Sequence, residues 1–452
     1  MDTGHVVVIG AGFAGLHAVR ALARDQRVRI TLVDQHNYHL FQPLLYQVAI
    51  AGLEAPQVTF PVRAFLRRYR RARFLLGRVT HIDRAAQRVS VDGAVLDYDY
   101  LIVSAGGRTV DFGIPGVAAH TVGLKSVRDA MTIRDRILSA CEEAVHTPDA
   151  ARRRALLTFV VIGGGPTGAE LAGALGELRR HVIRRDFPEL DLGEVRVVLI
   201  EAAPRVLTHL APSSSDYAAR FLRSTGVELL TDTAVAEVTA HAVHTRDGQV
   251  IPTFSAIWSA GIGGVAVPGL PEPGRAGRIA TTPALHLPDD PRAYVVGDLN
   301  YLEDPATGRP LPQVAPLAIQ QGIHAARNIR RDVHGQPLRP FRYLDKGNMV
   351  TLGRNHAVAE RGRLRVRGWL AWVMWLVVHL IYLLGGRNRF MVLSNWAYSY
   401  FTYDYAVRTL HQRVEFPPDP PPPDAPTGAG RTPQCGPEWQ RRSSVNSSRL
   451  SE

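Results

Sequence analysis

The sequence predicts an α/β fold in which two parallel-sheet domains are followed by a helical C-terminal segment. Three observations lead to this prediction. Short apolar runs of strand length alternate with helix-like stretches along most of the chain, which is typical of parallel sheets covered by helices on both faces. The pattern Gly-x-Gly-x-x-Gly follows such a run twice, at residues 10–15 and 163–168. Closer to the C-terminus, residues 369–384 are apolar except for His379.

Both glycine motifs stand where a dinucleotide-binding unit needs them. Val7-Val8-Ile9 precedes the first motif and Val160-Val161-Ile162 precedes the second. In such a unit the first glycine makes a tight turn, the second lets the backbone approach a pyrophosphate, and the third lets helix and strand pack closely. The N-terminus of the helix then faces the anion. Because the motif occurs twice, the sequence predicts two Rossmann-like domains and two bound dinucleotides.

An acidic residue closes a later strand in each half of the chain. Asp34 lies 24 residues after Gly10, and Glu201 lies 38 residues after Gly163. A carboxylate at this place can hydrogen-bond the ribose hydroxyls of an adenosine. The longer second spacing predicts an insertion, which we place at residues 179–194. A 2'-phosphate about 4 Å from the charge of Glu201 would be repelled by roughly 4 kcal/mol at an effective dielectric near 20, so NADH is favoured over NADPH.

Four further segments resemble a known family. They are residues 37–49, 257–261, 312–322 and 345–349, and they are similar to motifs of the type II NADH dehydrogenases, the single-chain, non-pumping NADH:quinone oxidoreductases. The resemblance covers roughly residues 5–412. The strand that ends in Gly297-Asp298 also resembles the wider two-dinucleotide-fold flavoproteins, in which this Asp binds the ribityl-pyrophosphate region of FAD. The resemblance implies that FAD occupies the N-terminal site and NADH the second.

The same resemblance implies the roles of individual residues. Glu170 is implied to lie near the nicotinamide and the quinone, where it can relay protons; the alternative is a carboxylate that the dipole stabilises near the N-terminus of its helix. Many family members carry Ala-Gln where this chain has Ala315-Pro316, so one quinone-contacting glutamine is absent. The candidate catalytic residues are Glu170, Gln320, Gln321 and Lys346. The candidate cofactor-binding residues are Gly10, Gly12, Gly15, Asp34, Ala105, Gly106 and Asp298 for FAD, and Gly163, Gly165, Gly168 and Glu201 for NADH.

Composition excludes several classes of protein. The chain has only two cysteines, Cys141 and Cys435, so the disulfide relay of thioredoxin- or glutathione-reductase-like enzymes cannot operate and sulfide:quinone reductases are disfavoured. His36 and His39 lack a third ligand nearby, so no metal site is expected. The net charge of +12 comes from scattered arginines without a nucleic-acid motif. Attraction to an anionic membrane surface explains this charge better than nucleic acid does.

The predicted domains follow from these motifs. The FAD-binding domain is discontinuous and comprises residues 1–118 and 262–345, with a second-layer segment at residues 58–98. The NADH-binding domain is inserted at residues 119–261. A membrane-docking region at residues 346–412 and a disordered tail rich in Pro and Ser at residues 413–452 complete the chain.

The apolar segment at residues 369–384 predicts contact with a membrane. As a helix its 16 residues reach about 24 Å, short of the roughly 30 Å hydrocarbon core. Arginines flank both ends and four of the six tryptophans lie in this region, which favours docking on one anionic face. A buried core or dimer-contact helix and a single membrane crossing are the alternatives. The chain begins without a signal-peptide pattern, so we expect the protein at the cytoplasmic face of the cell membrane.

These features together predict an FAD-dependent enzyme that transfers hydride from NADH to FAD and then two electrons to a membrane quinone, without proton pumping. Two alternatives stay open: a soluble NAD(P)H flavoprotein reductase for ferredoxin or rubredoxin, and a non-catalytic NADH-responsive flavoprotein. The expected partners are NADH, a membrane quinone and an anionic membrane surface, and a homodimer is a further candidate.

Overall fold

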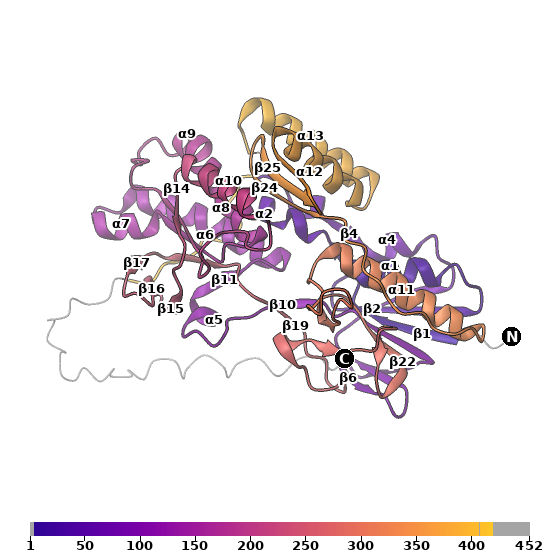
Figure 1. Cartoon of the computed structure of the whole chain (residues 1–452). Helices are drawn as coiled ribbons and strands as arrows, with labels where there is room; N and C mark the ends of the chain where they lie inside the picture. Colours follow the sequence, from indigo (N-terminus) through magenta and orange to yellow (C-terminus); the bar gives the residue numbers. More distant parts are fainter. Residues whose placement is uncertain (1–3, 406, 419–452) are drawn as a thin grey trace, which may run out of the picture. The chain divides into compact units, whose positions relative to one another are not determined.

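Six strands form the sheet that carries the first glycine motif (Figure 1). The computed structural model describes residues 4–405 and 407–418. The strands are, in spatial order, β21 (His286–Leu287), β22 (Asp290–Val295), β9 (Tyr100–Val103), β1 (Gly4–Ile9), β2 (Val28–Asp34) and β5 (Ala72–Leu76). β1 pairs in parallel with both β2 and β9, and all of its residues after the first are buried. A continuous apolar run fits this central position because both of its faces are covered.

The second glycine motif belongs to a sheet of five parallel strands. Their order is β11 (Thr121–Gly123), β18 (Ser255–Trp258), β12 (Thr158–Ile162), β13 (Arg196–Ile200) and β14 (Val227–Leu230). β12 lies between β13 and β18, just as β1 lies between β2 and β9. The two sheets confirm the predicted α/β fold with two Rossmann-like units. The strands of each sheet lie within the corresponding predicted domain, while the domain boundaries themselves stay a prediction.

Helices cover the faces of both sheets. In the first unit α1 (Phe13–Leu22) packs against α11 (Ala315–Val333), and a Cβ atom on Gly322 would collide with the backbone of Ala14. Glycine therefore allows these two helices to touch. The second unit contains α6 (Val127–His146), α7 (Ala150–Leu156), α8 (Pro166–Leu178) and α10 (Pro212–Ser224). α8 continues through a π-helical turn at Arg179–Ile183 into α9 (Arg184–Asp186), which accounts for the insertion predicted at residues 179–194.

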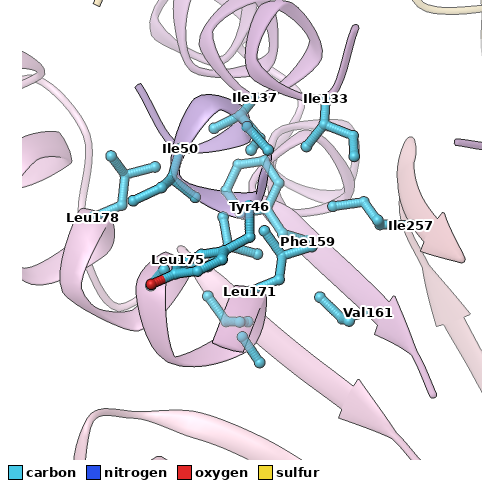
Figure 2. Close-up of a cluster of buried hydrophobic side chains, with 14 of the residues drawn as sticks. Tyr46, Ile50, Ile133, Ile137, Phe159, Val161, Leu171, Leu175, Leu178 and Ile257 are labelled. Carbon is cyan, nitrogen blue, oxygen red and sulfur yellow. The ribbon is translucent and has the colours of Figure 1, made fainter. Parts of the chain in front are cut away.

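One helix from the first unit is buried in the core of the second. α2 (Leu45–Ala49) lies against α6 and α8. Figure 2 shows its Tyr46, together with the adjacent Ile50, among apolar side chains of the second unit. These side chains come from α6, β12, α8 and β18, and include Ile133, Ile137, Phe159, Val161, Leu171, Leu175, Leu178 and Ile257. Residues 45–50 thus join the two units, which the sequence did not predict.

Small antiparallel sheets complete the two units. β6 (Val79–Asp83), β7 (Arg88–Val91) and β8 (Ala94–Asp97) form the predicted second-layer segment between β5 and β9. β15 (Val235–Val238), β16 (Ala242–Thr245) and β17 (Val250–Pro252) form a similar sheet in the second unit. β10 (Gly107–Thr109) pairs with β19 (Ile262–Gly264) where the chain passes between the units. The remaining short strands are β3 (Tyr38–Leu40), β4 (Thr59–Pro61), β20 (Ile279–Ala280) and β23 (Asn300–Tyr301).

The C-terminal region differs in part from the predicted helical segment. It begins with an antiparallel sheet of β24 (Asn348–Gly353), β25 (His356–Arg361) and β26 (Leu364–Gly368). Arginine alternates with other residues from 361 to 367, and a period of two is the repeat of a strand. The arginines expected before the helix therefore lie on a β-hairpin, whereas Arg387 and Arg389, expected after it, lie in the first turn of α13.

Two helices follow this hairpin. α12 (Trp369–Tyr382) packs on β25 and β26, and α13 (Gly386–Thr402) lies beside it (Figure 1). Within residues 4–405 and 407–418, no helix is both long enough and apolar enough to cross a membrane. The disorder predicted for residues 413–452 falls outside the described residues, except for 413–418.

Candidate active site

The first and third glycines of each motif are required by the protein's own packing. Gly10 and Gly163 have positive φ angles of 97° and 109°, which favour glycine. A Cβ atom on Gly15 would collide with the carbonyl of Gly10, and one on Gly168 would collide with the carbonyl of Gly163. These four glycines make the tight turn and the close approach of helix to strand that the motif predicts.

The middle glycines, Gly12 and Gly165, are not required by the chain itself. Their φ angles are −73° and −71°, which any residue adopts, and a Cβ atom on either would meet nothing within 4 Å. Each is the N-cap of its helix, so the open space lies in front of unpaired backbone N–H groups. A side chain here would fill the place where a pyrophosphate binds. Both sites therefore fit a dinucleotide, and the glycine keeps room for it.

The two predicted ribose carboxylates make the same hydrogen bonds in both halves. Asp34 Oδ2 accepts from the N–H of Ala11 at 2.6 Å, and Glu201 Oε2 accepts from the N–H of Gly164 at 2.5 Å. In each case the other oxygen accepts from the backbone N–H two residues further on, at 2.7 Å for Asp34 and 2.8 Å for Glu201. Each carboxylate thus links its strand end to the glycine turn, and its remaining lone pairs can accept from ribose hydroxyls.

Two serines support the glycine turns, and sequence reasoning missed them. Ser104 Oγ donates to the carbonyl of Ile9 at 2.7 Å, and Ser259 Oγ donates to the carbonyl of Ile162 at 2.9 Å. They follow the equivalent strands β9 and β18. The tripeptide Ser-Ala-Gly occurs at both places, at residues 104–106 and 259–261. This repeat is the signal that would have predicted their shared role.

The structure brings Asp298 to the end of β9, beside the predicted residues Ala105 and Gly106. A Cβ atom on the adjacent Gly107 would lie 3.0 Å from Asp298 Oδ2. Burial raises the pKa of Asp298, while the cations of Lys125 and Arg278 act in the opposite direction. Its carboxylate is therefore available at the same end of the sheet as the first glycine motif.

Gln321 has a different place from the one expected of a quinone contact. Its side chain is fully buried, and its amide makes two hydrogen bonds inside the protein. Oε1 accepts from the backbone N–H of Gly297 at 2.8 Å, and Nε2 donates to the Asn300 side chain, at Oδ1, at 2.7 Å. Gln321 thus holds the Gly297-Asp298 turn in position. A buried residue with this role is shielded from a headgroup, which corrects the expectation of direct contact.

The other two expected quinone-side residues lie near the surface. The Gln320 amide donates to the carbonyl of Leu344 at 2.9 Å and accepts from its N–H at 3.0 Å. Lys346 is exposed, and its Nζ donates to the Tyr382 hydroxyl of α12 at 2.9 Å. Within the described part of the chain, no hydrogen bond or ion pair joins Glu170 to Gln320, Gln321 or Lys346. Pro316 is in the first turn of α11, where its missing N–H breaks no helical hydrogen bond.

Glu170 is buried on α8, the helix that begins within the second glycine motif. It is only 9% exposed, and its Oε1 accepts a long hydrogen bond of 3.4 Å from the N–H of Thr351 on β24. Burial raises the pKa of Glu170 to about 8. A cavity of about 90 Å³ adjoins it, lined by residues of α2, α8, β24, α12 and α13. Glu170 therefore retains its proton near neutral pH beside a cavity that reaches the C-terminal helices.

Comparison with known proteins places the chain among flavoenzymes. A family model described as pyridine nucleotide-disulphide oxidoreductase matches residues 4–322. The type II NADH:quinone oxidoreductase Ndh of Mycobacterium tuberculosis is 39% identical over 428 residues, which covers 91% of each chain. A second such protein of that organism, NdhA, is 38% identical over 414 residues and 87% of each chain. The structure of NDH2 from Plasmodium falciparum in complex with NADH has the same fold, with a TM-score of 0.83 at 18% identity over 89% of this chain and 99% of that one.

Proposed function

We propose a function from one premise: the chain belongs to the pyridine nucleotide-disulphide oxidoreductase family and, within it, to the type II NADH:quinone oxidoreductases. It oxidises NADH through bound FAD and reduces a quinone. The single observation that carries this function is the pair of glycine sites, each with an open N-cap and a carboxylate at the neighbouring strand end. Two such sites in one chain bring an electron donor and a flavin together.

The residues divide between the two nucleotides. Gly12, Asp34 and Asp298 would hold FAD, whereas Gly165 and Glu201 would hold NADH. When bound, FAD accepts the hydride of NADH and passes two electrons to the quinone. The helix N-termini at the two N-cap glycines neutralise part of the pyrophosphate charge and orient each nucleotide. We assign the relay of a proton to the quinone to Glu170, because burial keeps this carboxyl protonated near neutral pH.

The two cysteines of the sequence do not form the neighbouring pair that a disulfide relay requires. Cys141 is fully buried, and burial raises its pKa to about 12, so it is a neutral thiol at physiological pH. The only other cysteine, Cys435, lies outside the described residues. A disulfide relay needs two neighbouring thiols, and this chain has no such sequence pair. The flavin therefore carries the electrons by itself.

The C-terminal helices support docking on a membrane. They expose apolar side chains that a protein usually buries, including Trp369 at 60%, Phe390 at 68% and Phe401 at 80%. Arg363, Arg365 and Arg387 lie in the same region and are exposed. Apolar side chains beside cations suit an anionic lipid surface, since the former enter the interface and the latter meet the headgroups. We place the protein peripherally on the cytoplasmic face of the cell membrane, where a lipid-soluble quinone is accessible.

Steady-state NADH oxidation with different acceptors tests this function. The protein reconstituted with FAD should reduce a soluble benzoquinone or naphthoquinone many times faster than it reduces ferredoxin. A higher rate with ferredoxin would identify a soluble reductase instead. A protein that binds both nucleotides but turns over with neither acceptor would be an NADH-responsive binding protein. The domain boundaries and a homodimer stay predictions.

A further inference from the structure

α8 carries a second carboxylate on the face that bears Glu170. Glu177 is seven residues further along, two turns of the helix, so the two side chains point to the same side about 10 Å apart along the axis. Both line the cavity of about 90 Å³. Glu170 is buried, whereas Glu177 is partly exposed. Glu177 therefore lies nearer the solvent side of a cavity whose inner end is Glu170.

Within the described part of the chain, Glu177 forms no ion pair, although the charge of Arg354 lies close enough to act on it. Its Oε1 accepts from the backbone N–H of Arg354 at 2.5 Å, and its Oε2 accepts from the Tyr405 hydroxyl at 3.4 Å. The guanidinium of Arg354 points elsewhere: it donates to the carbonyls of Ser399 and Tyr400 at the end of α13, at 2.7 and 3.0 Å. Burial raises the pKa of Glu177, while the hydrogen bonds from the Arg354 backbone and the Tyr405 hydroxyl, and the charge of Arg354, act in the opposite direction.

Two other titratable groups lie near the two carboxylates: Tyr46 lines the same cavity, and His379 packs on its lining residue Trp375. Tyr46 of α2 is buried, and its hydroxyl, which lies at the edge of the apolar cluster in Figure 2, accepts from Gln47 Nε2 at 2.9 Å. Burial raises the pKa of this tyrosine, and the nearby Glu170 and Glu177 raise it further. On α12, His379 stacks on Trp375 with ring centroids 3.9 Å apart, and burial lowers the pKa of His379 to about 4, so it stays neutral. Glu170 and Glu177 are thus the two carboxyl groups that line this cavity, and burial raises the pKa of both.

We propose that Glu177 is the entry point for the solvent proton of the reaction, and that water in the cavity carries this proton from Glu177 to Glu170. This inference rests on the proposed function. NADH supplies two electrons and one hydrogen as hydride, so the reduction of a quinone to a quinol needs one further proton. The cavity has room for several water molecules and is lined by polar groups that can bind them. Glu177 acts through Glu170 and is a relay residue without contact to the quinone.

Glu177→Gln tests the relay, because it keeps the shape and removes the exchangeable proton. Quinone turnover should fall at least about tenfold. This loss is smaller than the 10²–10⁴-fold typical of a group that itself transfers the proton, because water in the cavity can replace part of the function of Glu177. The solvent isotope effect on quinone turnover should rise. Bleaching of the flavin by NADH under anaerobic conditions should keep its wild-type rate, because this step takes no proton from solvent.

Three comparisons separate a relay from a structural role. Glu177→Asp should restore part of the turnover, and formate should restore part of it in Glu177→Ala, since a small acid fits the vacated mouth of the cavity. Glu228→Gln on β14, which alters a partly exposed ion pair with Arg196 of β13, should match the wild type. Equal loss of flavin bleaching and quinone turnover in Glu177→Gln, or no loss of turnover, would overturn the relay. A wild-type protein inactive with every quinone would overturn the proposed function itself.

Discussion

Replacing Gly165 by valine should abolish NADH binding while the folded protein keeps its FAD. The backbone at Gly165 has φ −71° and ψ −174°, which valine adopts readily, and the space around its Cα is empty of protein atoms within 4 Å. The loss of N-cap preference costs about 1 kcal/mol of helix stability. The substitution therefore acts on whatever occupies the open space in front of α8.

The expected loss of affinity follows from the hydrogen bonds that the valine would block. A pyrophosphate at the start of α8 accepts from backbone N–H groups, and each hydrogen bond to a charged group contributes roughly 1.5–3 kcal/mol. Losing two of them weakens binding by about 3–6 kcal/mol, on the order of 10²- to 10⁴-fold in Kd. The dependence of the rate of flavin bleaching on NADH concentration, followed by anaerobic stopped-flow absorbance, measures this Kd.

Two matched variants complete the experiment. Gly12→Val makes the same change at the start of α1 and should yield colourless protein that has lost FAD. Gly386→Val alters a third glycine with open space, at the start of α13, and should change neither nucleotide. A Gly165→Val protein with the wild-type Kd for NADH would refute the reasoning. The reasoning would also be refuted if Gly165→Val lost its FAD while Gly12→Val kept it.

Three further predictions concern specificity, pH and the membrane. Glu201→Gln should reduce the preference for NADH over NADPH about tenfold, because a carboxylate about 4 Å from a 2'-phosphate repels it by about 1 to 4 kcal/mol. An unchanged ratio of kcat/KM for the two nucleotides would exclude Glu201 as the source of this preference. Quinone turnover should fall as pH rises through about 8, where Glu170 loses its proton. Glu170→Gln should remove this fall at high pH and lower the rate about 100-fold. A pH profile of Glu170→Gln identical to that of the wild type would count against a role of Glu170 in proton transfer. Phe390→Glu combined with Phe401→Glu, both on α13, should reduce partition onto phosphatidylglycerol-containing vesicles at least tenfold, since burying one Phe contributes roughly 1.5–3 kcal/mol. Sedimentation with vesicles at the wild-type level would contradict docking through α13.

The pH dependence of stability gives an independent check on Glu170. Its pKa is raised from 4.5 to about 8 in the folded protein, so between these values the unfolded chain releases a proton that the folded chain retains. The unfolded state then binds fewer protons, and stability falls as pH rises through this window. Glu170→Gln should remove this contribution and become more stable relative to wild type toward pH 8. Thermal unfolding at pH 5 and pH 8 measures the difference.

Local patterns predicted the two nucleotide sites because their chemistry is local. A strand, a glycine turn and a helix start lie within about a dozen consecutive residues, and Gly10, Gly12 and Gly15 sit where that order places them. The acidic residues were predictable as well, since Asp34 and Glu201 end strands that pair directly with β1 and β12. Pairing of neighbouring strands in a Rossmann-like unit brings each carboxylate to its glycine turn without any help from distant residues.

The region after residue 345 was predicted less well because its pattern is ambiguous. The alternation of arginines at residues 361–367 has the period of a strand, yet these arginines were interpreted as the flank of the apolar helix expected at residues 369–384. β24, β25 and β26 pair as consecutive antiparallel neighbours joined by tight turns, so this sheet was within reach of local sequence patterns. The helix expected at residues 369–384 corresponds to α12, which ends at Tyr382, and a side chain on Gly385 in the following break would collide with Phe60.

The amino-acid sequence alone determined the fold class, the two dinucleotide sites and the identity of their glycines and carboxylates, since each arises from a short stretch of chain with its own geometry. Only the tertiary structure decided that Gln321 is a buried support for Asp298, that α2 packs into the second unit, and that Glu170 and Glu177 share one cavity. Burial and long-range contact depend on how α8 meets α2, β24 and the C-terminal helices. No local pattern records such meetings, because they join residues more than 100 positions apart.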